Sequence, residues 1–404
     1  MKTSSRSALQ RTHHDGLLRK LDWRPTTQPS SGPVDAIIVP ASRRAQHLGG
    51  LVDLAARCGA TLVVFASHQC DIDEAAALVA STPGSGRAVL AEIPSAEFAK
   101  VQTPSGEVLD LAQMATSQDQ FRALNGNRSS NLSFKRNLGL LLARFRGWQK
   151  IMFLDDDLIG VTQEHVARIG HHLATNRFAG LKTLQFPDNS VVCHANRLVG
   201  RPQGIFVSGA GLGVNTSDAI DLQIFPDVYN EDWFAFAAEA ATAGVAHVGD
   251  VKQLSFNPFE DPQRAAFEEF GDLMAEGLYA LFNDDGWTPH RATESYWTDF
   301  IDVRQRFVTR LREELVNNET HERAQAMRSM QEALVRLEDI KPVHCVEFLA
   351  AWQDDRRTFA HASRRAGHRP CGYDDAFTAL GIRRWQEAFF GVARIPAAAT
   401  VTTR

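Results

Sequence analysis

Three consecutive acidic residues are the strongest chemical feature of this 404-residue sequence. Asp155, Asp156 and Asp157, here called the aspartate cluster, directly follow the apolar run 151–154. Carboxylates this close repel one another, and a divalent cation that prefers oxygen ligands, Mg²⁺ or Mn²⁺, relieves the repulsion. Such a cation can bridge the phosphates of a nucleotide diphosphate and stabilise the charge on a leaving group. A solvated acidic turn or a helix N-terminal cap explains the same three residues equally well.

The segment before the aspartate cluster gives it a context. Residues 132–146 have the periodicity of a helix and lead into the strand that ends at the cluster, and the sequence from 135 to 157 reads KRNLGLLLARFRGWQKIMFLDDD. This segment resembles family 2 glycosyltransferases and related enzymes of the GT-A type, in which an (A/K)RN-x-G helix precedes a strand that ends in a DxD-type motif.

The resemblance implies roles for the acidic and basic residues of this segment. By this resemblance, Asp155 would face the nucleoside while Asp156 or Asp157 reaches the metal. Asp155 and Asp156 are expected to contact the nucleotide. Asp155 and Asp157 are expected as metal ligands. Lys135 and Arg136 would lie near the nucleotide. An exposed cation on a helix is the plain alternative for Arg136.

A second acidic pair stands before an aromatic helix start. Glu231 and Asp232 resemble the ED motif of inverting GT-A enzymes, in which the aspartate is the general base. That base must accept the proton of the acceptor hydroxyl as its oxygen attacks the anomeric carbon, so a partly enclosed carboxylate is needed. Asp232 is the first candidate and Glu231 the second. A cap of the helix N-terminus is the alternative for Asp232.

Two loops after apolar strands fit the same scheme. In GT-A enzymes the loop after the first strand holds the nucleobase and ribose, and small residues let the backbone approach a ligand. The resemblance implies that residues of these loops contact the nucleotide. The candidates are Pro40, Ser42 and Arg43 (or Arg44) after the first strand, and Ser67 (or Asp71) after the second. An ordinary polar loop explains each single residue nearly as well.

The segment 208–215 is rich in glycine, with Gly209 and Gly211 as its first two glycines. In GT-A enzymes such a segment lies under the donor sugar, which the missing side chains admit. The string lacks the lysine of a Walker A loop and does not open a βαβ unit. A late histidine would complete the metal shell by the same resemblance; His247 is the first candidate, with His194 and His290 as alternatives. A surface or structural role is the better explanation of any single histidine.

The elements that must position these residues follow from hydrophobic periodicity. Apolar β-branched runs predict strands, and amphipathic runs between them predict helices, so a mostly parallel, Rossmann-like sheet flanked by helices is expected. The predicted strands are 34–40, 61–66, 88–92, 150–154, 181–186 and 205–208. The predicted helices are 45–57, 72–81, 132–146, 161–176, 262–283, 293–317, 319–338 and 345–366.

This pattern divides the chain into four parts. Residues 1–33 are expected as an N-terminal extension, 34–260 as a GT-A nucleotide-sugar-binding catalytic domain, 261–395 as a mainly helical C-terminal region and 396–404 as a tail. The C-terminal helices are candidates for a homodimer surface.

Composition excludes several other classes. A formal net charge of −5 does not favour a nucleic-acid partner. The five cysteines are scattered, which favours reduced thiols and a cytoplasmic protein. The sequence contains no run of about 18 apolar residues, so it does not predict a membrane span.

The expected function is that of a metal-dependent glycosyltransferase. It would transfer a sugar from a UDP- or GDP-sugar, with Mn²⁺ or Mg²⁺, to a small soluble acceptor, with inversion through Asp232. The alternatives are a retaining GT-A enzyme of the glucosylglycerate or mannosylglycerate synthase type, a sugar-phosphate nucleotidyltransferase, and a protein that binds nucleotide sugars without catalysis.

Overall fold

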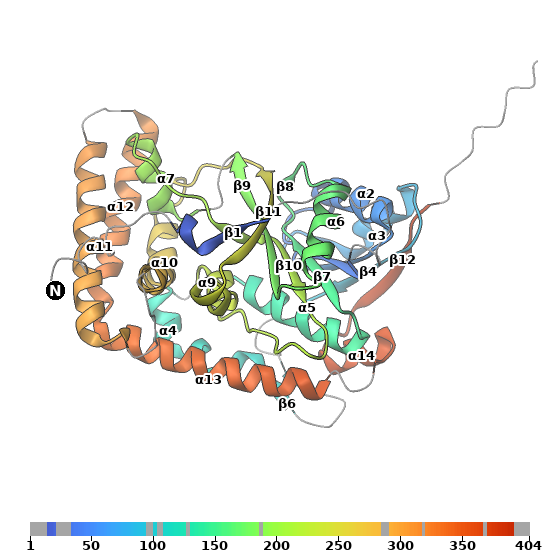
Figure 1. Cartoon of the computed structure of the whole chain (residues 1–404). Helices are drawn as coiled ribbons and strands as arrows, with labels where there is room; N and C mark the ends of the chain where they lie inside the picture. The colour runs from blue at the N-terminus through green and yellow to red at the C-terminus, as the bar shows by residue number, and fades with distance from the viewer. Residues whose placement is uncertain are drawn as a thin grey trace, which may run out of the picture.

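The computed structural model describes residues 14–21, 34–93, 100–102, 108–126, 130–185, 189–283, 291–316, 320–366 and 370–391. One large mixed sheet lies at the centre, with helices on both faces and a helical part at one side (Figure 1). The expected α/β architecture with a mainly helical C-terminal region is confirmed. The expected tail 396–404 lies outside the described residues.

The central sheet is mostly parallel. Its strand order is β1-β11-β9-β10-β7-β2-β3-β4-β12, β8 pairs with β11, and β5 and β6 form a separate pair. Strand β10 is antiparallel to both its neighbours, and β12 is antiparallel to β4. The strands are β1 (Leu18–Lys20), β2 (Ala36–Val39), β3 (Thr61–Ala66), β4 (Arg87–Glu92), β5 (Lys100–Gln102), β6 (Val108–Asp110), β7 (Lys150–Leu154), β8 (Leu158–Ile159), β9 (Phe178–Gln185), β10 (Val207–Asn215), β11 (Val245–Gln253) and β12 (Trp385–Phe389).

The helices form two groups, those that cover the sheet and those that stand beside it (Figure 1). No described helix has the length and apolar character needed to cross a membrane. The α-helices are α2 (Gly49–Cys58), α3 (Ile72–Ser81), α4 (Asp119–Leu124), α5 (Leu132–Arg146), α6 (Gln163–His172), α7 (Val191–Leu198), α8 (Glu231–Ala235), α9 (Ala237–Thr242), α10 (Gln263–Phe282), α11 (Glu294–Leu315), α12 (His321–Asp339), α13 (Pro342–Ala366) and α14 (Tyr373–Ala379). Short 3₁₀ turns are η1 (Asp15–Leu17), η2 (Ala45–Leu48), η4 (Leu111–Gln113) and η5 (Ala115–Ser117).

Alternation along the buried strands separates two hydrophobic cores. In β2, Ile37 and Val39 join a core with α2, α3 and α6, whereas Ile38 points to the opposite face, toward α5. Both faces of β2 are buried, which is why its sequence is apolar throughout. The helix α5 therefore lies under the strands whose ends carry the candidate site.

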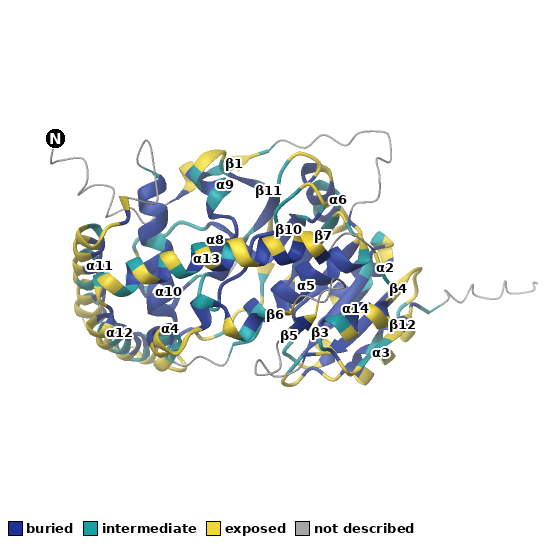
Figure 2. Cartoon of the chain, turned by 90° about the horizontal axis from the view of Figure 1, so that it is seen from below, coloured by how far each residue is buried: buried dark blue, intermediate teal, exposed yellow. Residues whose placement is uncertain are grey.

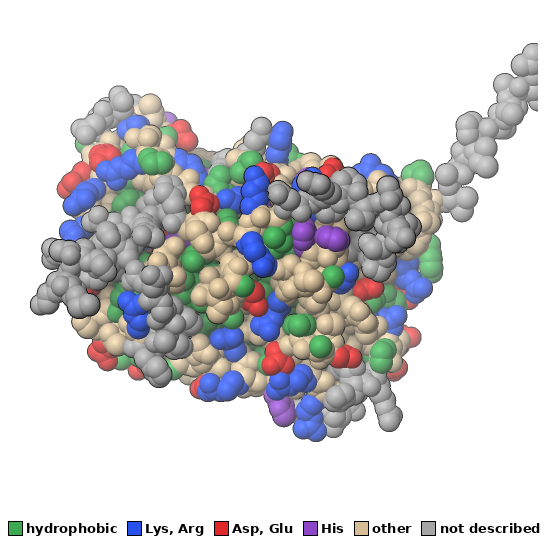
Figure 3. Space-filling view, viewed as in Figure 1, with side chains coloured by type: hydrophobic (Ala, Val, Ile, Leu, Met, Phe, Trp, Pro, Cys, Tyr) green, Lys and Arg blue, Asp and Glu red, His purple; other side chains and the backbone are tan. Residues whose placement is uncertain are grey.

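The C-terminal helices follow the predicted periodicities closely. Helices α10, α11, α12 and α13 match the four predicted helices after residue 261 to within a few residues. Helix α13 runs across the molecule and shows its exposed residues on the outer side (Figure 2). Basic and acidic side chains are interspersed on the face drawn in Figure 3.

The sheet takes its edge strands from outside the expected catalytic domain. Strand β1 comes from the expected N-terminal extension and pairs with β11 in parallel. Strand β12 comes from the expected helical region and pairs with β4. The sheet thus contains residues from three of the four expected parts. Strand β10 also extends beyond the predicted 205–208, because its glycines are buried between β7 and β9 despite their low strand propensity.

Candidate active site at the carboxyl ends of β2, β3 and β7

The aspartate cluster lies where three neighbouring parallel strands end. Strand β7 pairs with β2, and β2 pairs with β3, both in parallel. The residues that follow these strands therefore meet at one edge of the sheet, the edge where open α/β sheets bind ligands. The backbone N–H of Asp155 donates to the carbonyl oxygen of Ala210 at 2.9 Å, which ties this edge to β10.

The loop after β2 holds the middle aspartate. Oδ2 of Asp156 accepts the backbone N–H groups of Ser42 at 2.8 Å and Arg43 at 3.0 Å. The guanidinium of Arg43 donates to Asp156 Oδ1 at 3.1 Å and to Asp157 Oδ2 at 3.0 Å. Asp156 is buried, whereas the side chain of Arg43 is 37% exposed. Arg43 thus supplies part of the positive charge that the aspartate cluster requires.

The other two aspartates differ in their surroundings. Asp157 Oδ2 also accepts the side-chain amide of Gln253 at 2.8 Å, whereas its Oδ1 is buried and has no hydrogen-bond partner among the described residues. Asp155 is the most exposed of the three, with 22% of its side chain accessible. Ligands can therefore approach the cluster from the Asp155 side.

Lys135 is buried beneath these loops. Its ammonium group donates to the carbonyl oxygen of Ala41 at 2.6 Å and to Ser67 Oγ at 2.7 Å, and so joins the loops after β2 and β3. Burial lowers the pKa of Lys135 from 10.5 to about 8, and Asp156 opposes this shift. Lys135 is a structural link between loops and a positive charge beside the cluster.

Arg136 joins the aspartate cluster to the second acidic pair. One guanidinium nitrogen donates to Glu231, and the other to both oxygens of Asp155, at 3.1 and 3.2 Å. The side chain of Arg136 is only 3% exposed, so the expected alternative of an exposed cation is wrong. The guanidinium lies against Gly209, where a Cβ would come within 2.6 Å of Cζ.

Asp232 occupies the first turn of α8. Its Oδ2 accepts the backbone N–H of Gly209, and its Oδ1 accepts the backbone N–H of Trp233 at 2.8 Å. Asp232 and Glu231 are both buried. The acidic pair and the aspartate cluster therefore share one site, connected through Arg136 and Gly209.

The remaining predicted residues fall in different places. Pro40 is buried and lies two residues before Ser42. The space that a side chain at Gly211 would need is taken by Leu181 at 3.2 Å. His247 lies near the start of β11, paired with Gly180 and with its Nε2 at 3.0 Å from Asp250 Oδ1, so the structure does not bring it to the aspartate cluster. The alternative ligand His290 lies outside the described residues.

Gln253 is a site residue that the sequence analysis missed. It ends β11, six residues beyond His247, and reaches Asp157 because β11 pairs with β8 directly after the cluster. A polar residue at the end of a strand is the only sequence signal for it. That signal is too common to identify a contact across 96 residues of chain.

An open pocket of about 800 Å³ is lined by α7, residues 255–259 and the start of α12. The backbone N–H of Leu254 donates to the carbonyl oxygen of Asp157 at 2.9 Å, and the pocket wall begins at the next residue, Ser255. His194, Arg197 and other side chains of mixed polarity line the rest of it. Its volume suits a small polar molecule.

The chemistry of the aspartate cluster fits a hard divalent cation. Carboxylate oxygens are the ligands that Mg²⁺ and Mn²⁺ prefer, and Asp157 Oδ1 is a buried oxygen without a hydrogen-bond partner in the part of the chain that the structure describes. Within the described ranges, no three acidic, histidine or cysteine side chains are already arranged as a metal-ligand group. Arg43 and Arg136 occupy the other oxygens, so a cation would have to replace part of their contacts.

No family model and no curated protein matches the sequence. Among solved structures, the chain is similar to glucosyl-3-phosphoglycerate synthase from Mycobacterium tuberculosis in complex with Mn²⁺, UDP and glucosyl-3-phosphoglycerate, with 14% identity, 67% of this chain and 90% of that chain covered, and a TM-score of 0.39. It is also similar to the mannosyltransferase PcManGT from Pyrobaculum calidifontis in complex with GDP-Man and Mn²⁺, with 12% identity, 94% and 91% covered, and a TM-score of 0.39.

Proposed function

We propose that the chain is a metal-dependent glycosyltransferase of the GT-A type, which transfers a sugar from a UDP- or GDP-sugar to a small acceptor. The observation that carries the proposal is the contact of Arg136 with both Asp155 and Glu231. Through this contact the aspartate cluster and the second acidic pair lie together at the carboxyl ends of β2, β3 and β7. The buried cations Lys135 and Arg136 lie beside them. An inverting transfer from a nucleotide-diphosphate sugar uses this combination, because the phosphates require positive charge and the attacking hydroxyl requires a base.

The aspartate cluster would hold Mn²⁺ or Mg²⁺, which would neutralise the diphosphate leaving group. The chain's own residues shape the rest of the donor site. Lys135 fixes the loops after β2 and β3 and keeps a positive charge beside the phosphates. Arg43 is partly exposed and can exchange its carboxylate contacts for phosphate oxygens, to which a guanidinium binds equally well.

Asp232 is the proposed general base of an inverting transfer. Its two oxygens accept the N–H groups of Gly209 and Trp233, which fixes the orientation of the carboxylate. Glu231 is neutralised by Arg136 and would keep that arginine in place rather than accept a proton. In the transfer, the acceptor oxygen forms a bond to the anomeric carbon, the bond to the diphosphate breaks, and the hydroxyl proton passes to Asp232.

One observation favours a retaining enzyme as the second candidate. Both oxygens of Asp232 already accept main-chain hydrogen bonds, and such bonds weaken a carboxylate as a base. In a retaining enzyme Asp232 would anchor α8 to β10, and no obligatory base would be needed.

Thermal unfolding of the purified chain with UDP-, GDP- and dTDP-sugars, with and without Mn²⁺, tests the proposal. A UDP- or GDP-sugar is expected to raise Tm only when the metal is present, and transfer is then measured with a panel of small hydroxyl acceptors. Metal-dependent binding without transfer or donor hydrolysis would identify a binding protein instead. Absence of any metal-dependent rise in Tm would refute the proposal.

A further inference from the structure

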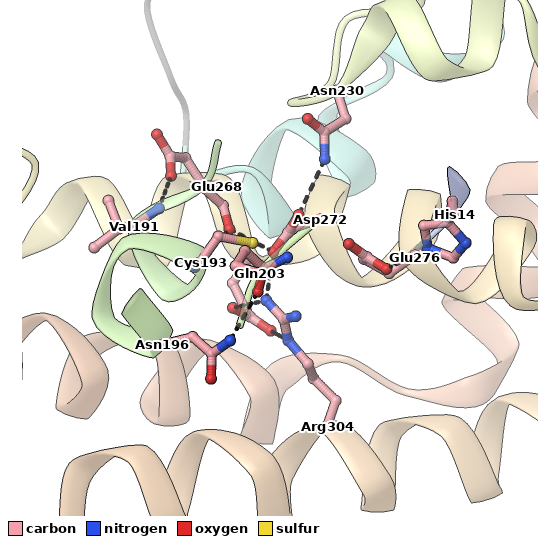
Figure 4. Close-up of polar contacts among 12 residues, drawn as sticks. His14, Val191, Cys193, Asn196, Gln203, Asn230, Glu268, Asp272, Glu276 and Arg304 are labelled. Atoms are coloured by element: carbon pink, nitrogen blue, oxygen red, sulfur yellow. Dashed lines mark hydrogen bonds and ion pairs between the residues drawn. The ribbon is translucent and has the colours of Figure 1, made fainter. Parts of the chain in front are cut away.

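The residue before the second acidic pair has an unusual conformation. Asn230 precedes Glu231 and adopts a left-handed backbone, with φ 61° and ψ 34°. At the start of a helix an asparagine side chain ordinarily accepts an N–H from the first turn. The side chain of Asn230 makes no such bond; its Nδ2 donates instead to Asp272 Oδ1 at 3.0 Å (Figure 4). The start of α8 is therefore bonded to α10.

Asp272 is itself fixed by a buried network (Figure 4). Its Oδ2 accepts Ser190 Oγ at 2.8 Å and Arg304 Nη2 at 2.5 Å. Arg304 also binds Glu269 through two nitrogens, at 2.8 and 3.0 Å. The side chains of Arg304, Asp272 and Glu269 are 9%, 4% and 0% exposed. Asp272 therefore has little freedom to move between α7, α10 and α11.

The backbone of α10 also touches the segment that carries the acidic pair. A Cβ on Gly271 would come within 2.3 Å of the carbonyl oxygen of Tyr229, so only a glycine permits this approach. On the other side of the pair, Tyr279 Oη donates to the carbonyl oxygen of Trp233 at 2.8 Å. Helix α10 therefore contacts the segment both before and after Glu231 and Asp232.

We propose that Asn230 and Asp272 are positioning residues through which the helical part of the chain sets the carboxylates of the acidic pair. This proposal rests on the proposed glycosyltransferase function. Asp156 and Asp157 are fixed separately by the loop after β2 and by Gln253, and Arg136 keeps its two bonds to Asp155 when the acidic pair moves. Loss of the Asn230–Asp272 bond should therefore displace Asp232 from Gly209 and leave the metal and donor site intact.

The replacement Asn230→Gly tests this most cleanly. Glycine adopts the left-handed backbone without strain, so the variant removes the side chain and keeps the turn. We expect kcat to fall about 10- to 100-fold, because small displacements of reacting groups slow a reaction by about that much. Donor KM and the metal-dependent rise in Tm should stay unchanged. Hydrogen exchange, measured by mass spectrometry, should be faster at 207–211 and 229–236, because the N–H groups of Gly209 and Trp233 bind Asp232.

A matched control comes from the same helix. Gln263→Ala removes the bond from exposed Gln263 on α10 to Glu332 on α12, at 2.8 Å, and should change neither exchange at 229–236 nor kcat. The double replacement Asn230→Asp with Asp272→Asn exchanges donor and acceptor and should recover kcat toward the wild-type value.

The outcomes separate this proposal from the proposed function. Wild-type exchange and wild-type kcat in Asn230→Gly would overturn the positioning role, as would an equal effect of Gln263→Ala. If the wild-type chain transfers no sugar from any donor, the glycosyltransferase proposal fails. Faster exchange confined to 207–211 and 229–236 would still establish that Asn230 positions the acidic pair.

Discussion

The Cα of Gly209 lies against the guanidinium of Arg136, and a Cβ at Gly209 would come within 2.5 Å of Nη1. The guanidinium of Arg136 cannot move away easily, because it is bonded to Asp155 and Glu231 on two sides and its side chain is 3% exposed. The glycine in β10 is therefore required by an arginine in α5. This contact links the metal side of the site to the base side.

Gly209→Ala should displace Arg136 and so weaken both the fold and donor binding. Overpacking of a buried position costs about 1–3 kcal/mol, which denaturant unfolding will measure. Calorimetry should show loss of binding of the UDP- or GDP-sugar. Gly50→Ala is the control, because beyond its own helix turn no atom of the described residues lies within 4 Å of its Cβ position, and α2 tolerates alanine. Equal effects of the two replacements would contradict the role of Arg136.

Removal of the metal should abolish donor binding. A ligand at about 100 times its Kd stabilises a protein by about 2.7 kcal/mol, and EDTA should remove that increment. Asp157→Asn should do the same, since an amide is a poorer metal ligand than a carboxylate. Asp53→Asn, in an exposed pair with Arg57 on α2, should retain the full increment. Donor stabilisation that persists in EDTA would exclude a role for the metal in binding.

Asp232→Asn should separate the inverting from the retaining mechanism. If Asp232 is the base, transfer should fall about 10²- to 10⁴-fold with donor affinity unchanged. Proton NMR of the product should then show an inverted anomeric configuration. The control Asp218→Asn alters a side chain that is 80% exposed and should transfer at the wild-type rate. Retained configuration with activity in Asp232→Asn would establish the retaining alternative.

Donor affinity should weaken as pH rises through about 8, the pKa to which burial lowers Lys135. Above that pH the amine is neutral, and loss of one charge beside the diphosphate should reduce affinity about tenfold. Stability should respond with the opposite sign. The unfolded chain keeps this proton up to its ordinary pKa of 10.5, so the contribution of Lys135 to the free energy of unfolding rises with pH between about 8 and 10.5.

Calorimetric titrations from about pH 6.5 to about pH 9 check the prediction for Lys135. Lys135→Met has no titrating group at this position, so its donor affinity should be weak and independent of pH in that range. Circular dichroism first establishes that the variant folds. A decline of the same size in Lys135→Met would assign the pH dependence to another group.

The sequence by itself determined the local elements and the place of the aspartate cluster. Strands β3 and β7 and helices α5 and α10 follow from hydrophobic periodicity, which the chain carries within each segment. Residues that follow a strand lie at the end of that strand however the other elements pack. The acidic residues after β7 therefore had to lie where the strands of the sheet end. The KRN motif likewise placed Lys135 and Arg136 at the start of the preceding helix.

The tertiary structure alone decided which residues meet at that edge. Arg43 and Gln253 reach Asp157 across 114 and 96 residues of chain, through strand pairings that no local pattern specifies. The edge strands β1 and β12 were missed for the same reason, since each is stabilised by its partner strand rather than by its own sequence. Likewise, Asn230 resembles an ordinary helix cap until α10 brings Asp272 to within 3.0 Å of it. Side-chain partners depend on how separate elements pack, and packing is a property of the whole chain.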